Sequence, residues 1–162
     1  MGWLPAPVER LLEVALVGEL TVVGRNARPI THPVIPLYRN GTVYMHSSTL
    51  FSRKLEHMKR DPRVSLAITD RVATKGNPDR ATIQGTARII EDDPHTDWDG
   101  LVYELWRRKE PSIDDFLKAR VALPLFFERA VIEVTPQRCL YWPNGDTDRP
   151  PEITTAPREE AA

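Results

Sequence analysis

The residues best suited to chemistry lie between Val43 and Arg63, in the segment VYMHSSTLFSRKLEHMKRDPR. A hydroxyl-rich turn there leads into a short predicted helix whose first turn contains Ser52, Arg53 and Lys54. A proline follows Asp61 and disfavours helical backbone before it, so the helix is expected to end there. Unsatisfied N–H groups and the macrodipole make a helix start attractive to anions. We therefore expect this helix start, with its two cations, to bind a phosphorylated cofactor.

The same residues also fit a purely structural interpretation. Serine before a helix is an ordinary N-cap, and the charged side chains of the helix can simply face solvent. Phe51, Leu55 and Met58 lie at i, i+4 and i+7 and supply the buried stripe that such a helix needs. Spacing alone leaves both interpretations open.

Size and composition exclude several classes of protein. The 162 residues suit one domain with a real core, and the formal net charge is −1. Such a charge gives no field that would draw the chain to nucleic acid or to an acidic membrane, so we expect neither partner. No apolar run is long enough to cross a bilayer, and no secretory signal begins the chain. The single cysteine, Cys139, rules out an internal disulfide and fits a cytoplasmic protein.

Hydrophobic periodicity predicts an N-terminal helix followed mainly by strands, with a helical pair interrupting the last strands. The predicted helices run from Pro7 to Val17, Asp97 to Lys109 and Ser112 to Arg120, besides the short helix after Ser52. The predicted strands run from Glu19 to Val23, Pro29 to Tyr38, Thr42 to Ser47, Val64 to Thr69, Arg80 to Glu91 and Phe126 to Val134. Arg138 to Trp142 is a seventh strand or a continuation of the sixth.

The order of these elements predicts a mainly β fold. Asn40-Gly41 is a strong hairpin signal, so the first three strands are expected to form an antiparallel meander. Gly85 within a long strand predicts a bulge or a close backbone approach. Six short antiparallel strands with flanking helices suit a small split β-barrel with Greek-key order. We assign residues 1–144 to this domain and read residues 145–162 as a mostly disordered tail, or as an arm against a neighbouring subunit.

With these elements in place, the chain resembles the pyridoxamine 5′-phosphate oxidase-like, flavin-binding split-barrel family. Three blocks carry the resemblance: GRNARPITHPV at 24–34, MHSSTLFSRKLEHMKRDPRV at 45–64 and ATIQGTARI at 81–89. The closing strand VIEVTPQRCLYW is similar to that of the family. Together the blocks span roughly Glu19 to Trp142, nearly the whole ordered chain.

The resemblance implies a homodimer that binds FMN, or the deazaflavin coenzyme F-420, at the subunit interface. It implies phosphate contacts from Ser52, Arg53 and Lys54, with Ser47 nearby. It further implies contacts with the ring from two strands, by His32, Pro33, Val34, Met45 and His46. It also implies one polar contact with the cofactor from Arg80, at the start of a third strand.

The activity implied is that of a flavin- or deazaflavin-dependent oxidoreductase, which moves a hydride between the ring and a small organic substrate. The arginine and histidine set that holds the pyridoxal substrate of true pyridoxamine phosphate oxidases is absent. The chain is more similar to the bacterial subgroup that uses FMN or F-420 as a reductant. The alternative is a non-catalytic protein that binds a flavin, F-420 or haem.

A metal site is not expected. The four histidines, His32, His46, His57 and His95, show neither i, i+4 pairing nor cysteine partners.

Overall fold

The computed structural model describes residues 2–48, 52–91, 101–109, 112, 115 and 129–157. The helices are α1 (Ala6–Val14), α2 (Arg53–Arg60) and α3 (Leu101–Lys109), with 3-10 turns at Arg25–Ala27 and Pro143–Gly145. The strands are β1 (Gly18–Val23), β2 (Pro29–Val34), β3 (Leu37–Arg39), β4 (Thr42–Ser48), β5 (Arg63–Ile68), β6 (Arg80–Ile90), β7 (Arg129–Trp142) and β8 (Glu152–Thr155).

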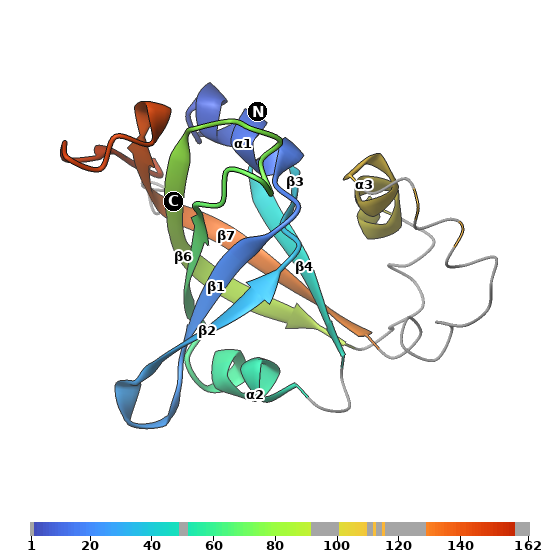
Figure 1. The fold of residues 1–162 in the computed structure, drawn as a ribbon. Coiled ribbons are helices and arrows are strands. Elements are labelled where there is room, and N and C mark those ends of the chain that lie inside the picture. The colour runs from blue at the N-terminus through green and yellow to red at the C-terminus, as the bar shows by residue number, and fades with distance from the viewer. Residues whose placement is uncertain are drawn as a thin grey trace.

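One antiparallel sheet forms the body of the protein. Its strands follow the order β2-β1-β5-β6-β7-β4-β3, and β8 pairs with the C-terminal part of β7. The two end strands of this path, β2 and β3, are joined by only Ile35 and Pro36. The three Cα–Cα steps from Val34 to Leu37 span at most about 11 Å, so the sheet must curl until its ends approach each other. Figure 1 shows the resulting half-barrel, and the predicted mainly β, antiparallel split barrel is confirmed.

The predicted second strand is in fact two strands. Pro29 to Tyr38 was expected to be continuous, but β2 ends at Val34 and β3 begins at Leu37. Pro36 has no N–H to donate to a ladder, so the chain leaves one end of the sheet there and starts the other. The predicted three-strand meander is therefore wrong. The β1–β2 and β3–β4 hairpins lie at opposite ends of the strand order and leave a gap between them.

The core fills the inside of the curl. Alternate residues of β1, β5 and β6 are buried, as expected for strands with one face on a core. α1 and α2 lie at opposite ends of the half-barrel, α1 at the top and α2 at the bottom of Figure 1. α2 contributes Leu55 and Met58 to the core, as the predicted stripe requires, and it ends at Arg60, before Asp61-Pro62. Cys139 is buried in β7, as expected for a strand residue.

Gly85 lies at a bulge, as predicted. The register between β6 and β7 shifts between Gln84 and Gly85, where the two backbones approach closely. A Cβ on Gly85 would lie 2.3 Å from the carbonyl oxygen of Thr135. The bulge lets β7 run without a break through Thr135-Pro136, so the continuation is correct and a separate seventh strand is not formed.

α3 packs beside β3 and β4 on a second, smaller apolar cluster. Leu105 lies there with Leu37 and Val131. The buried Lys109 donates hydrogen bonds to the carbonyl oxygens of Leu12 and Pro36, and burial lowers its pKa to about 7. α3 confirms part of the helix predicted from Asp97. Residues 97–100 and most of the helix predicted from Ser112 lie outside the described residues.

The C-terminal segment is more ordered than its composition indicates. Glu152–Thr155 form β8, in register with Arg138 to Tyr141 of β7. The interpretation of this segment as mostly disordered is therefore wrong for these four residues. Three of the four β8 residues are exposed, so the absence of an apolar period is understandable.

Candidate functional site

The start of α2 is tied to the end of β4 by a pair of hydroxyl groups. Ser47 Oγ donates a hydrogen bond to Ser52 Oγ at 2.6 Å. Ser52 is the N-cap residue of α2, but its side chain makes no capping hydrogen bond. The structural interpretation assumed that its hydroxyl would cap the helix, and this is wrong. Because Ser52 Oγ accepts from Ser47, its own proton remains available to a ligand at the helix start.

Two strand edges border the gap in the barrel next to this helix start. Among the described residues β2 pairs only with β1, so its other edge has no strand partner there. β3 pairs with Thr42 to Tyr44 of β4 and stops there, which leaves the edge of β4 beyond Tyr44 without a strand partner among the described residues. Backbone N–H and C=O groups on such edges are available to a planar ligand with donors and acceptors on its rim.

His32 of β2 lies on the inner side of the barrel and close to α2. Its register partner Leu20 is a core residue. Burial lowers the pKa of His32, and the charge of Lys54 and the neighbouring His57 lower it further. The Nε2 atom of His32 is buried and has no hydrogen-bond partner among the described residues. Such an unsatisfied group is uncommon in a folded protein and is a natural place for a ligand atom.

The structure brings only part of the predicted set together. His32, Ser47, Ser52 and Lys54 gather around the start of α2, and Arg53 lies exposed beside them. The exposed Pro33 lies next to His32 on β2.

Three other predicted residues face elsewhere. Met45 is fully buried and Val34 is nearly so, and both belong to the main core, so their side chains are not exposed to a ligand. His46 alternates with Met45 along β4 and therefore faces the opposite side of the sheet. Only the backbone of these residues borders the gap.

Arg80 is separate from the rest of the predicted site within one protomer. It is exposed at the start of β6, paired with Trp142, whereas Pro62, two residues after the end of α2, accepts a hydrogen bond from Ala87 N near the other end of β6. Seven residues of strand separate Arg80 from Ala87, which is roughly 23 Å. Arg80 can meet the α2 start only if a second chain supplies it.

A basic cleft lies along one face of α2, against the turn between β1 and β2. Its volume is about 720 Å³. Its lining combines one face of α2 with the turn, namely Arg25, Asn26, Arg28, Pro29, Ile30, Arg53, Glu56, His57 and Arg60. This cleft was not predicted from the sequence. The spacing of Arg53, His57 and Arg60 at i, i+4 and i+7 was the available signal, and it was read as a solvated face.

Comparison with known proteins identifies the family. The profile of the pyridoxamine 5′-phosphate oxidase family matches residues 4–143, which is most of the chain. This chain belongs to that family. No curated protein sequence matches the chain. The predicted family is therefore confirmed.

Solved structures share this family member's fold at low sequence identity. A conserved hypothetical protein from Mycobacterium tuberculosis has a TM-score of 0.68 at 18% identity and covers 98% of this chain and 94% of its own. An F-420 reductase has a TM-score of 0.61 at 20% identity, covering 84% and 98%. A haem binding protein from Mycobacterium smegmatis has a TM-score of 0.56 at 21% identity, covering 94% and 59%. These similarities establish the fold.

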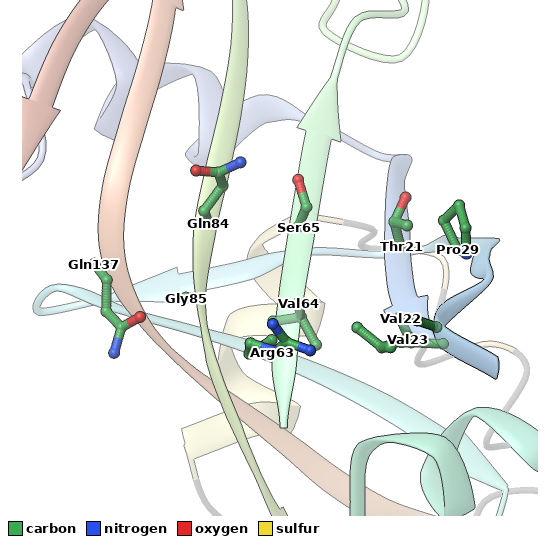
Figure 2. A pocket seen from close by; sticks show the side chains of 11 residues that line it. Thr21, Val22, Val23, Pro29, Arg63, Val64, Ser65, Gln84, Gly85 and Gln137 are labelled. Carbon is green, nitrogen blue, oxygen red and sulfur yellow. The ribbon is translucent and has the colours of Figure 1, made fainter. Parts of the chain in front are cut away.

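The outer face of the sheet of this oxidase-family chain carries a shallow pocket of about 520 Å³. Thr21, Ser65 and Gln84 occupy facing positions on β1, β5 and β6, and Figure 2 shows them in a row across the strands. Thr31 continues the row on β2, where its hydroxyl lies 2.9 Å from that of Thr21. This row is uncharged from β2 to β6, and charge appears only at its margins, at Arg63 of the pocket lining and at Arg138, the register partner of Gln84 on β7.

Metal-binding clusters and membrane-spanning helices are both absent from the part of the chain that the structure describes. No group of three or more histidine, cysteine, aspartate or glutamate side chains is arranged to hold a metal ion there. None of the helices described is both long and apolar enough to cross a membrane.

Proposed function

We propose that this protein binds a phosphorylated flavin or deazaflavin, FMN or F-420, and acts as an oxidoreductase on a small organic substrate. The observation that carries the proposal is the α2 start. There a serine N-cap leaves its helix uncapped, receives a hydrogen bond from Ser47 and is followed by Arg53 and Lys54. That arrangement offers a hydroxyl donor, helix N–H groups and two cations to one phosphate.

The residues around the gap fit such a cofactor. Ser52, Arg53 and Lys54 would hold the phosphate, and backbone groups on the edges of β2 and β4 that lack a described strand partner would bind the rim of the ring. His32 Nε2, buried and unsatisfied among the described residues, supplies a polar contact from the inner side. The bound cofactor supplies the hydride chemistry, while the protein orients it and limits access of water. The fold of an F-420 reductase and the family as a whole support this assignment.

We also propose that the active form is a homodimer. The uncharged row on the outer face of β1, β5 and β6 suits packing against a second sheet, since charged groups there would lose water on contact. A second chain is also what would bring an arginine such as Arg80 to the site. A dimer therefore accounts both for the uncharged row on the outer face and for the distance of Arg80 from the rest of the predicted site.

The alternative is a protein that binds the cofactor without turnover. The shared fold of a haem binding protein favours haem as its ligand in that case. His46 is then the candidate iron ligand, because it faces the outer side of β4 with a ring nitrogen that is buried.

Absorbance distinguishes these functions directly. The purified protein is incubated separately with FMN, F-420 and haemin, passed through a desalting column and scanned. We expect the FMN or the F-420 bands to be retained, and the reduced holoprotein to be reoxidised faster in the presence of a small quinone or nitro compound than alone. Retention of haem alone would favour the alternative, and retention of none of the three would contradict both.

A further inference from the structure

The basic cleft between α2 and the β1–β2 turn has no role in the function proposed above. Arg53 is shared with the helix start and His57 neighbours His32, whereas Arg25, Arg28 and Arg60 lie along the turn and the far end of α2. The inference below rests on these three residues and would survive if the cofactor proposal failed. Figure 1 shows the turn extending below the sheet, alongside α2.

The cleft gathers positive charge that the described residues do not neutralise. Four arginines line it, and none of them forms an ion pair with a described carboxylate. The one acidic lining residue, Glu56, is bonded to Lys59 at 3.2 Å, and Lys59 also reaches Glu91 at 2.9 Å. Like charges facing each other across a concave surface repel, and a bound anion relieves that repulsion.

Several of these groups are held in place before any ligand arrives. Arg60 donates through one nitrogen to the carbonyl oxygen of Val23 and lies 3.2 Å from His57 Nδ1. An arginine can only donate, so His57 Nδ1 accepts and, in the neutral ring, its Nε2 carries the proton. The turn is closed by a 2.7 Å bond from Gly24 N to Arg28 O, with Arg25 and Arg28 at its two ends. Side chains with nitrogen donors therefore line the cleft on both sides, on α2 and on the β1–β2 turn.

We propose that this cleft binds a small polyanion, a molecule with at least two phosphate or carboxylate groups. Guanidinium groups bind both kinds of group through paired hydrogen bonds, and four of them exceed what one phosphate can use. The volume of about 720 Å³ suits a small molecule. A nucleic acid would need a basic surface that continues beyond the cleft, whereas the whole chain has a formal net charge of −1.

Tripolyphosphate is the probe for this site. Isothermal titration at low ionic strength compares the wild-type chain with the double variant Arg25→Gln/Arg28→Gln. Neither side chain forms a hydrogen bond or an ion pair with described residues, so the variant is expected to fold, which its thermal transition verifies. The matched control is Arg10→Gln/Arg138→Gln, which removes the same charge from exposed positions outside the cleft.

We expect tripolyphosphate to bind the wild type and the control alike, and to bind the cleft variant about tenfold more weakly. Equal affinity in the cleft variant and the control, or affinity no greater than that for orthophosphate, would overturn the proposal. A short single-stranded oligonucleotide that binds more tightly than tripolyphosphate and loses affinity in the cleft variant would also overturn it.

Repeating the titration on protein saturated with its cofactor identifies the source of the polyanion. If tripolyphosphate still binds, the cleft takes a separate molecule. If the cofactor and tripolyphosphate compete, and the cleft variant weakens binding of the cofactor as well, the cleft holds an anionic extension of that cofactor. Either result supports a polyanion site. The two results differ only in the source of the anion.

Discussion

Single residues show how far side-chain types alone can be read. Ser52, Arg53 and Lys54 were predicted as a phosphate site from their position at a helix start, and the structure places them there. The sequence did not reveal that Ser47 would occupy the cap hydroxyl, because that bond joins two elements. The sequence also did not show that Met45 faces the core whereas His46 faces the opposite side of the sheet. Which of two neighbours on a strand faces the core depends on the register with β7, which only the folded sheet defines.

His32 should make stability sensitive to acid. Its pKa is lowered by burial, by Lys54 and by His57, so the unfolded chain takes up a proton more readily than the folded one. Stability contributed by neutral His32 is therefore lost as the pH falls from its ordinary pKa of about 6.5 towards the lowered folded value. The loss of thermal stability between about pH 7.5 and about pH 5.5 should be smaller in His32→Gln than in the wild type. An equal loss of thermal stability in His32→Gln and in the wild type would show that the protonation of His32 does not change on unfolding.

At the scale of elements, local patterns predicted most strands and the position of α2. Gly85 marked the bulge, and Asp61-Pro62 marked the end of the helix. The failures have a common cause, which is that pairing is non-local. The break at Pro36 depends on β3 joining β4 across the barrel, and β8 exists because β7 offers it an edge. Asn40-Gly41 predicted the hairpin of β3 and β4, but the separation of β3 from β2 and the pairing of β8 with β7 cannot be read from those segments themselves.

The bulge at Gly85 should tolerate no side chain. In Gly85→Ala the new Cβ would meet a backbone carbonyl of β7 at 2.3 Å, so one strand must shift. We expect a loss of about 1–3 kcal/mol in the free energy of unfolding, measured by urea denaturation. Gly18→Ala is the control, because its Cβ meets the ends of the flexible side chains of Ile68 and Leu66, at 2.7 and 2.9 Å. Equal losses in the two variants would argue against a rigid contact between β6 and β7.

At the scale of the whole molecule, the two-residue link between the end strands of the sheet explains the curl, and the curl creates the gap beside α2. The sequence indicated the barrel through its family resemblance and hairpin signals, but not the bare outer face. That face is visible only when Thr21, Ser65 and Gln84 are seen to share one register row. The proposed dimer follows from this row.

Charge placed on the outer face should separate the proposed dimer. Ser65→Arg introduces a cation between Thr21 and Gln84, which a second sheet would have to desolvate. Light scattering coupled to gel filtration should find the wild type as a dimer and the variant shifted to monomer. Val72→Arg adds the same charge at a loop residue that is 86% exposed and should remain dimeric. A wild-type monomer, or a Ser65→Arg dimer as stable as the control, would contradict this interface.

The central claim is that the α2 start binds the phosphate of the cofactor, and FMN and riboflavin differ by that phosphate alone. Fluorescence titration of both ligands against wild type, Lys54→Ala and the control Lys59→Ala isolates its contribution. Lys59 lies on the same helix but pairs with Glu56 and Glu91.

We expect the wild type to prefer FMN over riboflavin. Lys54→Ala should weaken FMN binding by about tenfold and leave riboflavin nearly unchanged, while Lys59→Ala alters neither. If the protein retains F-420 instead, the same comparison uses F-420 and its phosphate-free deazaflavin. Equal losses for the ligands with and without phosphate, or unchanged affinity for both in Lys54→Ala, would contradict a phosphate site at this helix start.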